Sequence, residues 1–107
     1  LLVAAGAWMR RGRMAALAAI DTALRDSGLH RSPNSGWPEA AMAGALGIGL
    51  AGPRVYGGTR VDEPMMNAAG RAQAGCEDID LALRIYSSAC LVLAAFVLAG
   101  ALLAVLF

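Results

Sequence analysis

Charged side chains are scarce in this sequence, and lysine is missing altogether. Charged residues make up 16% of the 107 residues, and the nine basic residues are all arginine. A chain without lysine offers no P-loop lysine and no Schiff-base lysine. The formal net charge is only +1, so we expect no nucleic-acid partner. Apolar types reach 58%, which excludes a disordered chain and argues against an ordinary water-soluble domain.

Residues for metal, redox or common hydrolytic motifs are also few. The two cysteines, Cys76 and Cys90, lack CxxC spacing, and on one helix they would lie about 21 Å apart, beyond the reach of a disulfide. The single histidine, His30, stands alone, and HExxH, GxSxG and Walker A patterns are absent from the sequence. Residues 47–52 match GxGxxG, but Pro53 follows where a dinucleotide site needs a helix.

Charge is absent from both ends of the sequence. Residues 89–107 are uncharged and nearly all apolar, and as a helix they would span about 28 Å, close to the hydrocarbon core of a bilayer. No face of this run is polar, which disfavours a buried helix of a soluble protein. Residues 87–107 are therefore predicted to form a transmembrane helix. Residues 1–9 are too short to span, but Trp8 and the arginines after it are typical of the end of a membrane helix.

Arginines flank both apolar ends, at positions 10, 11, 13 and 84. Because arginine is enriched on the cytoplasmic side of membranes, residues 10–86 are predicted to be cytoplasmic. The expected fold is an all-α integral membrane protein with the end of one transmembrane helix, a cytoplasmic helix-loop region and one C-terminal transmembrane helix. We expect residues 1–107 to be a single C-terminal fragment of a multi-pass domain of the inner (plasma) membrane, in contact with the lipid bilayer and packed against helices that precede it.

Two helices are predicted in the first half of the cytoplasmic region. Apolar residues at helical spacing and an Asp21–Arg25 pair predict a helix over 14–26, ended by Gly28. Pro33 and Gly36 predict a turn-rich loop over 30–37. Pro38 suits the first position of a second helix over 38–46, with an acid in its first turn. The small residues Ala40, Ala43, Gly44 and Gly47 would let this helix approach another closely.

Residues 47–75 are expected to be mostly irregular, because they hold seven of the thirteen glycines and two prolines. Short apolar runs at 55–56 and 59–61, around Gly57-Gly58, predict a small hairpin. The last helix is expected over 77–107, with Glu77 and Asp78 at its positive end.

Candidate functional residues fall in two places. Gly57 and Gly58 allow backbone N–H groups to approach an anion, and Arg31, Arg54 and Arg60 are candidates for phosphate contacts. Carboxylates at positions 39, 62 and 63 are candidate Mg²⁺ ligands. The residues alone leave alternatives open. Glu39 is equally suited to a helix-dipole partner, the indole of Trp37 to a membrane-interface anchor, and residues 62–63 to a solvated turn.

A long stretch of uncommon residues narrows these alternatives. Residues 32–47, SPNSGWPEAAMAGALG, followed by Gly52-Pro53 and by Tyr56-Gly57-Gly58, closely resemble the CobD/CbiB family of cobalamin biosynthesis proteins. The resemblance extends less specifically to residues 78–86 and only loosely to 61–75. The chain is similar to the C-terminal third of the family's proteins.

The resemblance implies an integral membrane adenosylcobinamide-phosphate synthase. Such an enzyme joins adenosylcobyric acid, a corrinoid carboxylic acid, to aminopropanol or its phosphate by ATP-dependent amide ligation. ATP and Mg²⁺ are the cofactors implied. We expect Glu39 to be the catalytic residue and a Mg²⁺ ligand. The residues expected to bind substrate or phosphate are Ser32, Asn34, Gly36, Trp37, Arg54, Tyr56, Gly57 and Gly58.

Two other classes of function stay open. A related branch of the same superfamily resembles AmpE, a membrane sensor without ligase activity. A membrane scaffold that packs through its small-residue helix is the third possibility. The intact motifs at 32–47 and 56–58 favour the synthase.

Overall fold

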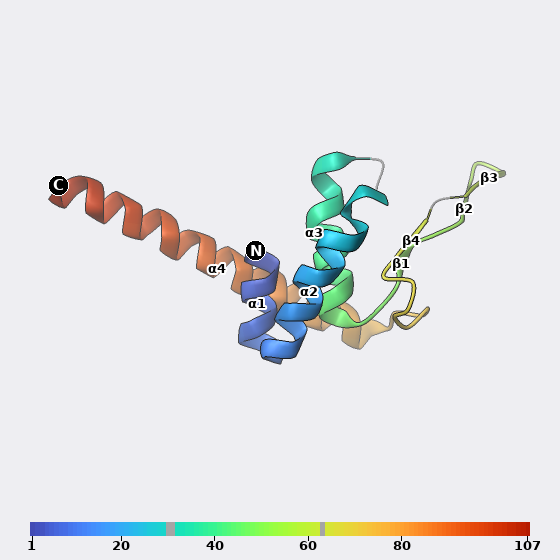
Figure 1. Cartoon of the computed structure of the whole chain (residues 1–107), viewed down its shortest axis with the longest axis horizontal. Helices are drawn as coiled ribbons and strands as arrows, with labels where there is room; N and C mark the ends of the chain where they lie inside the picture. The colour runs from blue at the N-terminus through green and yellow to red at the C-terminus, as the bar shows by residue number, and fades with distance from the viewer. Residues whose placement is uncertain (30–31, 63) are drawn as a thin grey trace.

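Helices dominate the computed structural model, which describes residues 1–29, 32–62 and 64–107. Helices α1 (Leu2–Arg11), α2 (Arg13–Asp26) and α3 (Pro33–Leu46) lie side by side, and a 3-10 turn, η1 (Ser27–Leu29), follows α2. Helix α4 (Cys76–Leu106) packs against α1 and then projects away from the other helices (Figure 1). The mostly helical fold predicted from the sequence is confirmed.

Small residues bring the helices into close contact. A Cβ atom added at Gly44 of α3 would lie 2.4 Å from the backbone oxygen of Ala18 in α2. A Cβ at Gly6 of α1 would lie 2.4 Å from the backbone oxygen of Ile85 in α4. These distances confirm that the small-residue spacing of α3 serves close helix approach. The core is accordingly rich in alanine, including Ala7, Ala16, Ala19, Ala40, Ala43 and Ala45.

Helix α2 turns its small side chains inward and its large ones outward. Its buried residues are Ala16, Ala19, Thr22 and Asp26. Leu17 is 46% exposed and Leu24 is 71% exposed. The predicted helix and its Asp21–Arg25 ion pair, with N–O distance 3.4 Å, are confirmed.

Helix α3 begins five residues earlier than the sequence predicts. Pro33, not Pro38, occupies the first helical turn, and Ser32 is the N-cap residue. Residues 32–37 are therefore not a loop. Pro38 lies inside the helix, where it forgoes one backbone hydrogen bond, a cost that the packing of α3 on α2 offsets. Gly28 does not cap α2 either, because residues 27–29 continue as η1. His30 and Arg31 lie outside the described residues.

The segment after α3 forms two short antiparallel ladders. The predicted hairpin is confirmed as β2 (Arg54–Tyr56) paired with β3 (Thr59–Val61). A second ladder joins β1 (Leu50–Ala51) to β4 (Met65–Met66), with Leu50 opposite Met66. This second ladder was not predicted from the sequence, and Met66 within it is almost completely buried.

Helix α4 starts and ends within one residue of its predicted bounds. The backbone N–H of Gly75 donates to the carboxylate of Asp78 at 2.9 Å, so an acid caps the helix start as expected. Cys76 and Cys90 are both free and exposed, which confirms that they form no disulfide.

The C-terminal half of α4 has almost no protein around it. It is the one helix, in the part of the chain that the structure describes, that is long and apolar enough to cross a membrane. Its most apolar window has a mean hydropathy of 2.8 and is only 6% buried. Phe96 is 72% exposed and Val105 is 84% exposed. Residues 2–9 are helical within α1, while the membrane placement of residues 1–9 and the cytoplasmic side of residues 10–86 stay predictions.

Candidate functional site

The first group of candidate residues lies along the start of α3. Ser32 has an extended backbone, with φ −89° and ψ 119°, and caps the helix. The N–H of Gly36 donates to the carbonyl of Ser32 at 3.2 Å. Asn34 is exposed and Gly36 is buried. The motif that carries the family resemblance, residues 32–47, is therefore the whole of α3 with the residues that cap its two ends.

Glu39 does not occupy the position that the sequence analysis gave it. It is the seventh residue of α3, and the first turn of that helix contains no acid. The expectation that Glu39 sits among the free N–H groups of a helix start is wrong, since these groups belong to the first turn. The residue is partly buried. Whether it acts in catalysis remains a prediction.

Trp37 lies over an apolar hollow. Its side chain is 51% exposed and lines a cavity of about 350 Å³ with Pro38 and Ala41 of α3, Ala23 of α2 and residues 1–3 of α1. The lining is almost entirely apolar, so this hollow suits hydrocarbon rather than phosphate. Trp37 thus has the surroundings expected for an interface anchor or packing residue.

The second group of candidates lies at the tip of the β2–β3 hairpin. Gly57 and Gly58 have φ angles of 55° and 81°, the left-handed pair that a two-residue hairpin turn requires. No atom lies within 4 Å of a Cβ built at either glycine. The tip is open, and both glycines are exposed. The strand residues Arg54 and Tyr56 belong to β2, but their side chains lie outside what the structure describes.

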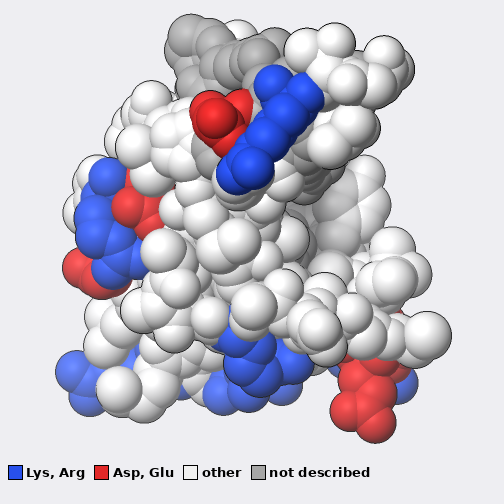
Figure 2. Space-filling model, turned by 90° about the vertical axis from the view of Figure 1, so that its right-hand side faces the viewer, with Lys and Arg blue, Asp and Glu red and all other residues white. Residues whose placement is uncertain are grey.

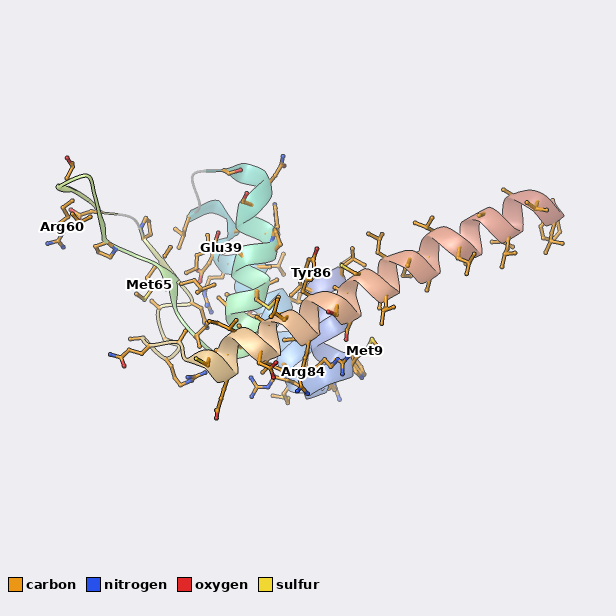
Figure 3. The ribbon with its side chains drawn as sticks, turned by 180° about the vertical axis from the view of Figure 1, so that it is seen from behind. Met9, Glu39, Arg60, Met65, Arg84 and Tyr86 are labelled. Atoms are coloured by element: carbon orange, nitrogen blue, oxygen red, sulfur yellow. The ribbon has the colours of Figure 1, made fainter. Side chains whose placement is uncertain are left out.

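The structure does not bring the two groups together within this chain. The hairpin extends away from the helices, and Arg60 lies toward its outer end, well separated from Glu39 (Figure 3). Arg60 donates to Asp62 of the same hairpin at 2.8 Å. Among the described residues, no three side chains of the Asp, Glu, His and Cys types gather as a metal site. Glu63 lies outside the described residues.

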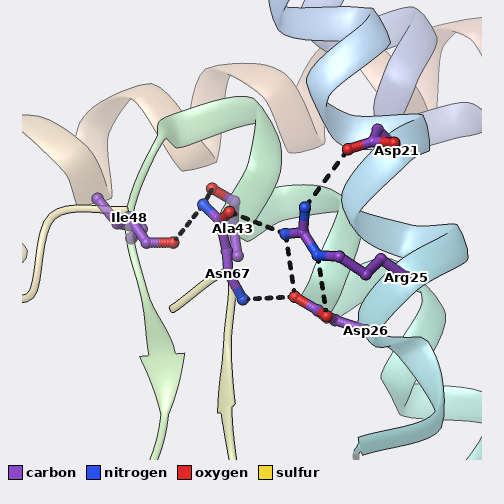
Figure 4. Close-up of polar contacts among 6 residues, drawn as sticks. All are labelled: Asp21, Arg25, Asp26, Ala43, Ile48 and Asn67. Atoms are coloured by element: carbon purple, nitrogen blue, oxygen red, sulfur yellow. Dashed lines mark hydrogen bonds and ion pairs between the residues drawn. The ribbon is translucent and has the colours of Figure 1, made fainter. Parts of the chain in front are cut away.

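A polar network that the sequence analysis missed fixes the segment after α3 to the helices (Figure 4). The carboxylate of Asp26, at the end of α2, accepts the backbone N–H of Asn67 at 2.7 Å. Arg25 donates to the same carboxylate at 3.1 and 3.2 Å. The Asn67 amide donates to the carbonyls of Ala43, at 3.3 Å, and Ile48, at 3.0 Å. Asn67 has φ 51°, a left-handed conformation that asparagine tolerates.

The electrostatics of this network stabilise a charged Asp26. Only 7% of the residue is exposed. The Arg25 guanidinium that donates to it lowers the pKa of this carboxyl, and the Asn67 N–H acts in the same direction, against the opposing effect of burial. A folded-state pKa below the unfolded value of about 3.9 stabilises the fold above that pH, and the contribution is lost as pH falls through the folded-state pKa.

We expect Asp26→Asn to lower the stability of the chain at pH 7 by about 1 kcal/mol, because a charge-assisted bond becomes a neutral one. The difference in stability between wild type and variant should narrow at pH 3, because the stabilisation by a carboxyl of lowered pKa weakens once the pH falls below the unfolded-state value of about 3.9. Thermal unfolding in mild detergent, followed by circular dichroism at both pH values, measures the effect. Asp21→Asn is the control, because Asp21 contacts the same arginine from an exposed position and should change stability by less than about 0.5 kcal/mol. An equal gap at both pH values would contradict the assignment.

A second ion pair joins the same segment to α4. Arg71 donates to both carboxylate oxygens of Asp78, whose side chain is 12% exposed. This contact lowers the pKa of Asp78, and the Gly75 N–H lowers it further. The two networks hold the segment after α3 in place at Asn67 and at Arg71. The β2–β3 hairpin lies between α3 and Asn67 in the sequence, before both of these attachment points.

Comparisons with known proteins agree over nearly the whole chain. The family described as CobD/Cbib protein matches residues 1–86. Several proteins called cobalamin biosynthesis protein CobD are similar over most or all of the chain. The one from Rhizobium meliloti is 63% identical over 107 residues, which is 100% of this chain and 33% of that protein. The one from Brucella suis is 48% identical over 102 residues, or 95% of this chain and 31% of that protein. The chain thus spans about a third of the length of the relatives it matches. No solved structure matches.

Proposed function

Because the chain belongs to the CobD/CbiB family, we propose that it is part of a membrane-bound cobalamin biosynthesis enzyme that joins adenosylcobyric acid to aminopropanol or its phosphate. The observation that carries the proposal is 63% identity to a cobalamin biosynthesis protein over 100% of this chain. That match spans both motifs of this chain, residues 32–47 and 56–58, whose presence favours the synthase over the sensor-like branch.

The separation of the two motif groups suggests how this part of the enzyme contributes. The start of α3 presents Ser32, Asn34 and Trp37, while the hairpin tip presents the open N–H groups of Gly57 and Gly58. Helix starts and glycine-rich turns both suit anionic oxygens. We propose that the two groups bind opposite ends of a large, multiply charged substrate, and that the rest of the full-length enzyme closes the site between them.

ATP, when bound, supplies the leaving group that a carboxylate lacks for amide formation. The carboxylates described in this chain do not fit a Mg²⁺ site by themselves, since Glu39 and Asp62 lie on separate elements and no third ligand accompanies them. In the proposal, Glu39 is the single ligand from this chain. The other ligands then belong to the part of the family's proteins that the chain does not span.

The test is the reaction itself. Full-length enzyme containing this chain, purified in detergent, is incubated with adenosylcobyric acid and aminopropanol phosphate, with and without ATP. ATP-dependent conversion of the acid to the amide, followed by liquid chromatography, supports the proposal. If the corrinoid is bound or ignored but never converted under conditions where a known synthase is active, the ligase assignment fails and the sensor class becomes the better one.

We further propose that α4 crosses the membrane from about residue 87 and that residues 10–86 are cytoplasmic. The exposed apolar surface of α4 and the arginines beside it support this placement. A fusion of alkaline phosphatase at Gly70 in the full-length protein should be inactive, and one at Phe107 should be active, because the phosphatase folds only outside the cytoplasm. The reverse pattern would contradict the orientation, and equal activity at both sites would contradict the span.

A further inference from the structure

Three arginines gather where α1 turns into α2. Helix α1 ends at Arg11, Gly12 makes the turn with φ 91°, and α2 begins at Arg13. We call Arg10, Arg11 and Arg13 the arginine corner. All three residues are exposed. In Figure 1 the turn lies at the lower edge of the molecule, and Figure 2 shows basic side chains along the same edge.

No carboxylate in the part of the chain that the structure describes forms an ion pair with the arginine corner. The ion pairs found there belong to Arg25, Arg60, Arg71 and Arg84. The first twenty residues contain three arginines and no acid. Arg11 donates to the carbonyl of Ala45 at 3.1 Å. The carboxylate of Asp78 is near enough for the charge of Arg11 to lower its pKa, but that carboxylate accepts its hydrogen bonds from Arg71. The corner is therefore a concentrated positive charge within a chain of net charge +1.

A hydrogen bond fixes the position of the arginine corner along α4. Arg10 Nε donates to Ser88 Oγ at 2.7 Å, and Ser88 is fully buried. Beyond Ser88 the helix is apolar and exposed, beginning with Leu91 at 63%. The arginine corner thus lies at the point where the polar part of α4 gives way to the part suited to hydrocarbon.

Exposed apolar side chains stand beside the arginines. Trp8 and Met9 of α1 are each 59% exposed, and Figure 3 shows Met9 beside α4, farther toward its apolar end than Arg84. Tryptophan next to arginine at the edge of an apolar surface is typical of the headgroup region of a membrane. A soluble phosphate would contact the arginines but gain nothing from the neighbouring indole and thioether.

We propose that the arginine corner, with Trp8 and Met9, binds the phosphate headgroups of anionic membrane lipids. The inference rests on the proposed membrane placement of α4. Guanidinium groups form paired hydrogen bonds to phosphate oxygens. Each arginine near an anionic surface contributes roughly fivefold in binding, from about 1 kcal/mol per charge. The site would hold the cytoplasmic end of α4 at the leaflet surface.

The chain supplies its own reporter for a test. The 107 residues contain two tryptophans, Trp8 and Trp37. Replacing Trp37, and every tryptophan of the full-length protein outside these residues, with phenylalanine leaves Trp8 at the arginine corner as the single one. This protein is placed in nanodiscs that contain phosphatidylglycerol and phosphatidylcholine, and one of the two lipids is brominated near the headgroup. Bromine quenches the fluorescence of a tryptophan in contact with it. The ratio of quenching by the two brominated lipids, at equal mole fraction, measures the lipid preference at Trp8.

We expect brominated phosphatidylglycerol to be preferred by roughly fivefold or more. Arg13→Gln should lower the preference for brominated phosphatidylglycerol by about threefold or more. Because Arg13 makes no side-chain hydrogen bond or ion pair with the described residues, this variant should keep the fold. The triple variant with glutamine at 10, 11 and 13 should show no preference. Arg60→Gln removes the same charge from the distant hairpin and should leave the ratio unchanged.

Four outcomes would overturn the inference. Equal quenching by both lipids leaves the membrane placement intact and rejects the headgroup site. Absence of quenching by either lipid rejects both the site and the placement of this corner at the membrane. Unchanged preference in the triple variant removes the arginines from the site. Displacement of phosphatidylglycerol by millimolar inorganic phosphate assigns the corner to a soluble phosphate compound instead. If the wild-type full-length enzyme shows no ligase activity in the corrinoid assay while the lipid preference at Trp8 is found, only the proposed reaction is rejected.

Discussion

Gly44→Ala is expected to lower the stability of the chain by about 2–3 kcal/mol, although alanine is the better helix former. The new methyl group would lie 2.4 Å from the backbone oxygen of Ala18 and 2.4 Å from Thr22 Oγ1. Thr22 can turn its side chain, but the carbonyl of Ala18 is fixed within α2. The two helices must therefore separate, which costs the contacts of the alanine-rich core around them.

Gly100→Ala is the matched control for this prediction. Gly100 lies in α4, and nothing lies within 4 Å of a Cβ built there. At this position the change from glycine to alanine is expected to alter helix propensity alone and to raise the stability of the chain by up to about 1 kcal/mol. Unfolding in a series of denaturing detergent mixtures, followed by circular dichroism, compares the two variants with wild type. Equal stability of Gly44→Ala and Gly100→Ala would contradict the close packing of α2 on α3.

The sequence predicts the long helices well because their signals are local. The apolar run and the acidic start of α4 can be recognised without knowing where any other element lies. The same holds for the helical spacing of apolar residues in α2. The start of α3 is the instructive error. Pro33 and Pro38 both suit a first helical position, and the presence of asparagine, serine and glycine between them favours a loop. Packing against α2 carries the helix through Pro38, and this contact is invisible in the local sequence.

The polar network around Asn67 could not be predicted for a different reason. Asp26 is the last residue of α2, and its partner Asn67 is 41 residues farther along the chain. An aspartate at the end of a helix, where the dipole disfavours negative charge, is a weak sign that another group compensates it. The position of Asn67 follows only from the fold, whereas Arg25 is the neighbour of Asp26 in the chain. Similarly, the family motifs identify candidate residues, but their separation into two groups depends on the direction of the hairpin.

Glu39→Gln in the full-length enzyme is expected to lower the rate of amide formation by about 100-fold or more. Glu39 is the one carboxylate within the 32–47 motif, and it is partly buried on α3 rather than at the helix start. Loss of a charge that contacts the metal or the reacting groups costs several kcal/mol of transition-state stabilisation. Conversion of adenosylcobyric acid at saturating substrate and matched membrane expression measures the effect.

A structural role for Glu39 predicts a different pattern. Glutamine would then lower stability or expression and leave the rate per folded enzyme within about threefold, a barrier change below roughly 0.7 kcal/mol. Glu77→Gln provides a matched control, because Glu77 is an exposed carboxylate in the first turn of α4 and lies outside both motif groups. Glu39→Asp keeps the charge and should recover part of the rate that glutamine loses. If aspartate and glutamine at position 39 are equally active, the charge takes no part in the reaction, and the contribution of α3 is limited to binding through Ser32, Asn34 and Trp37.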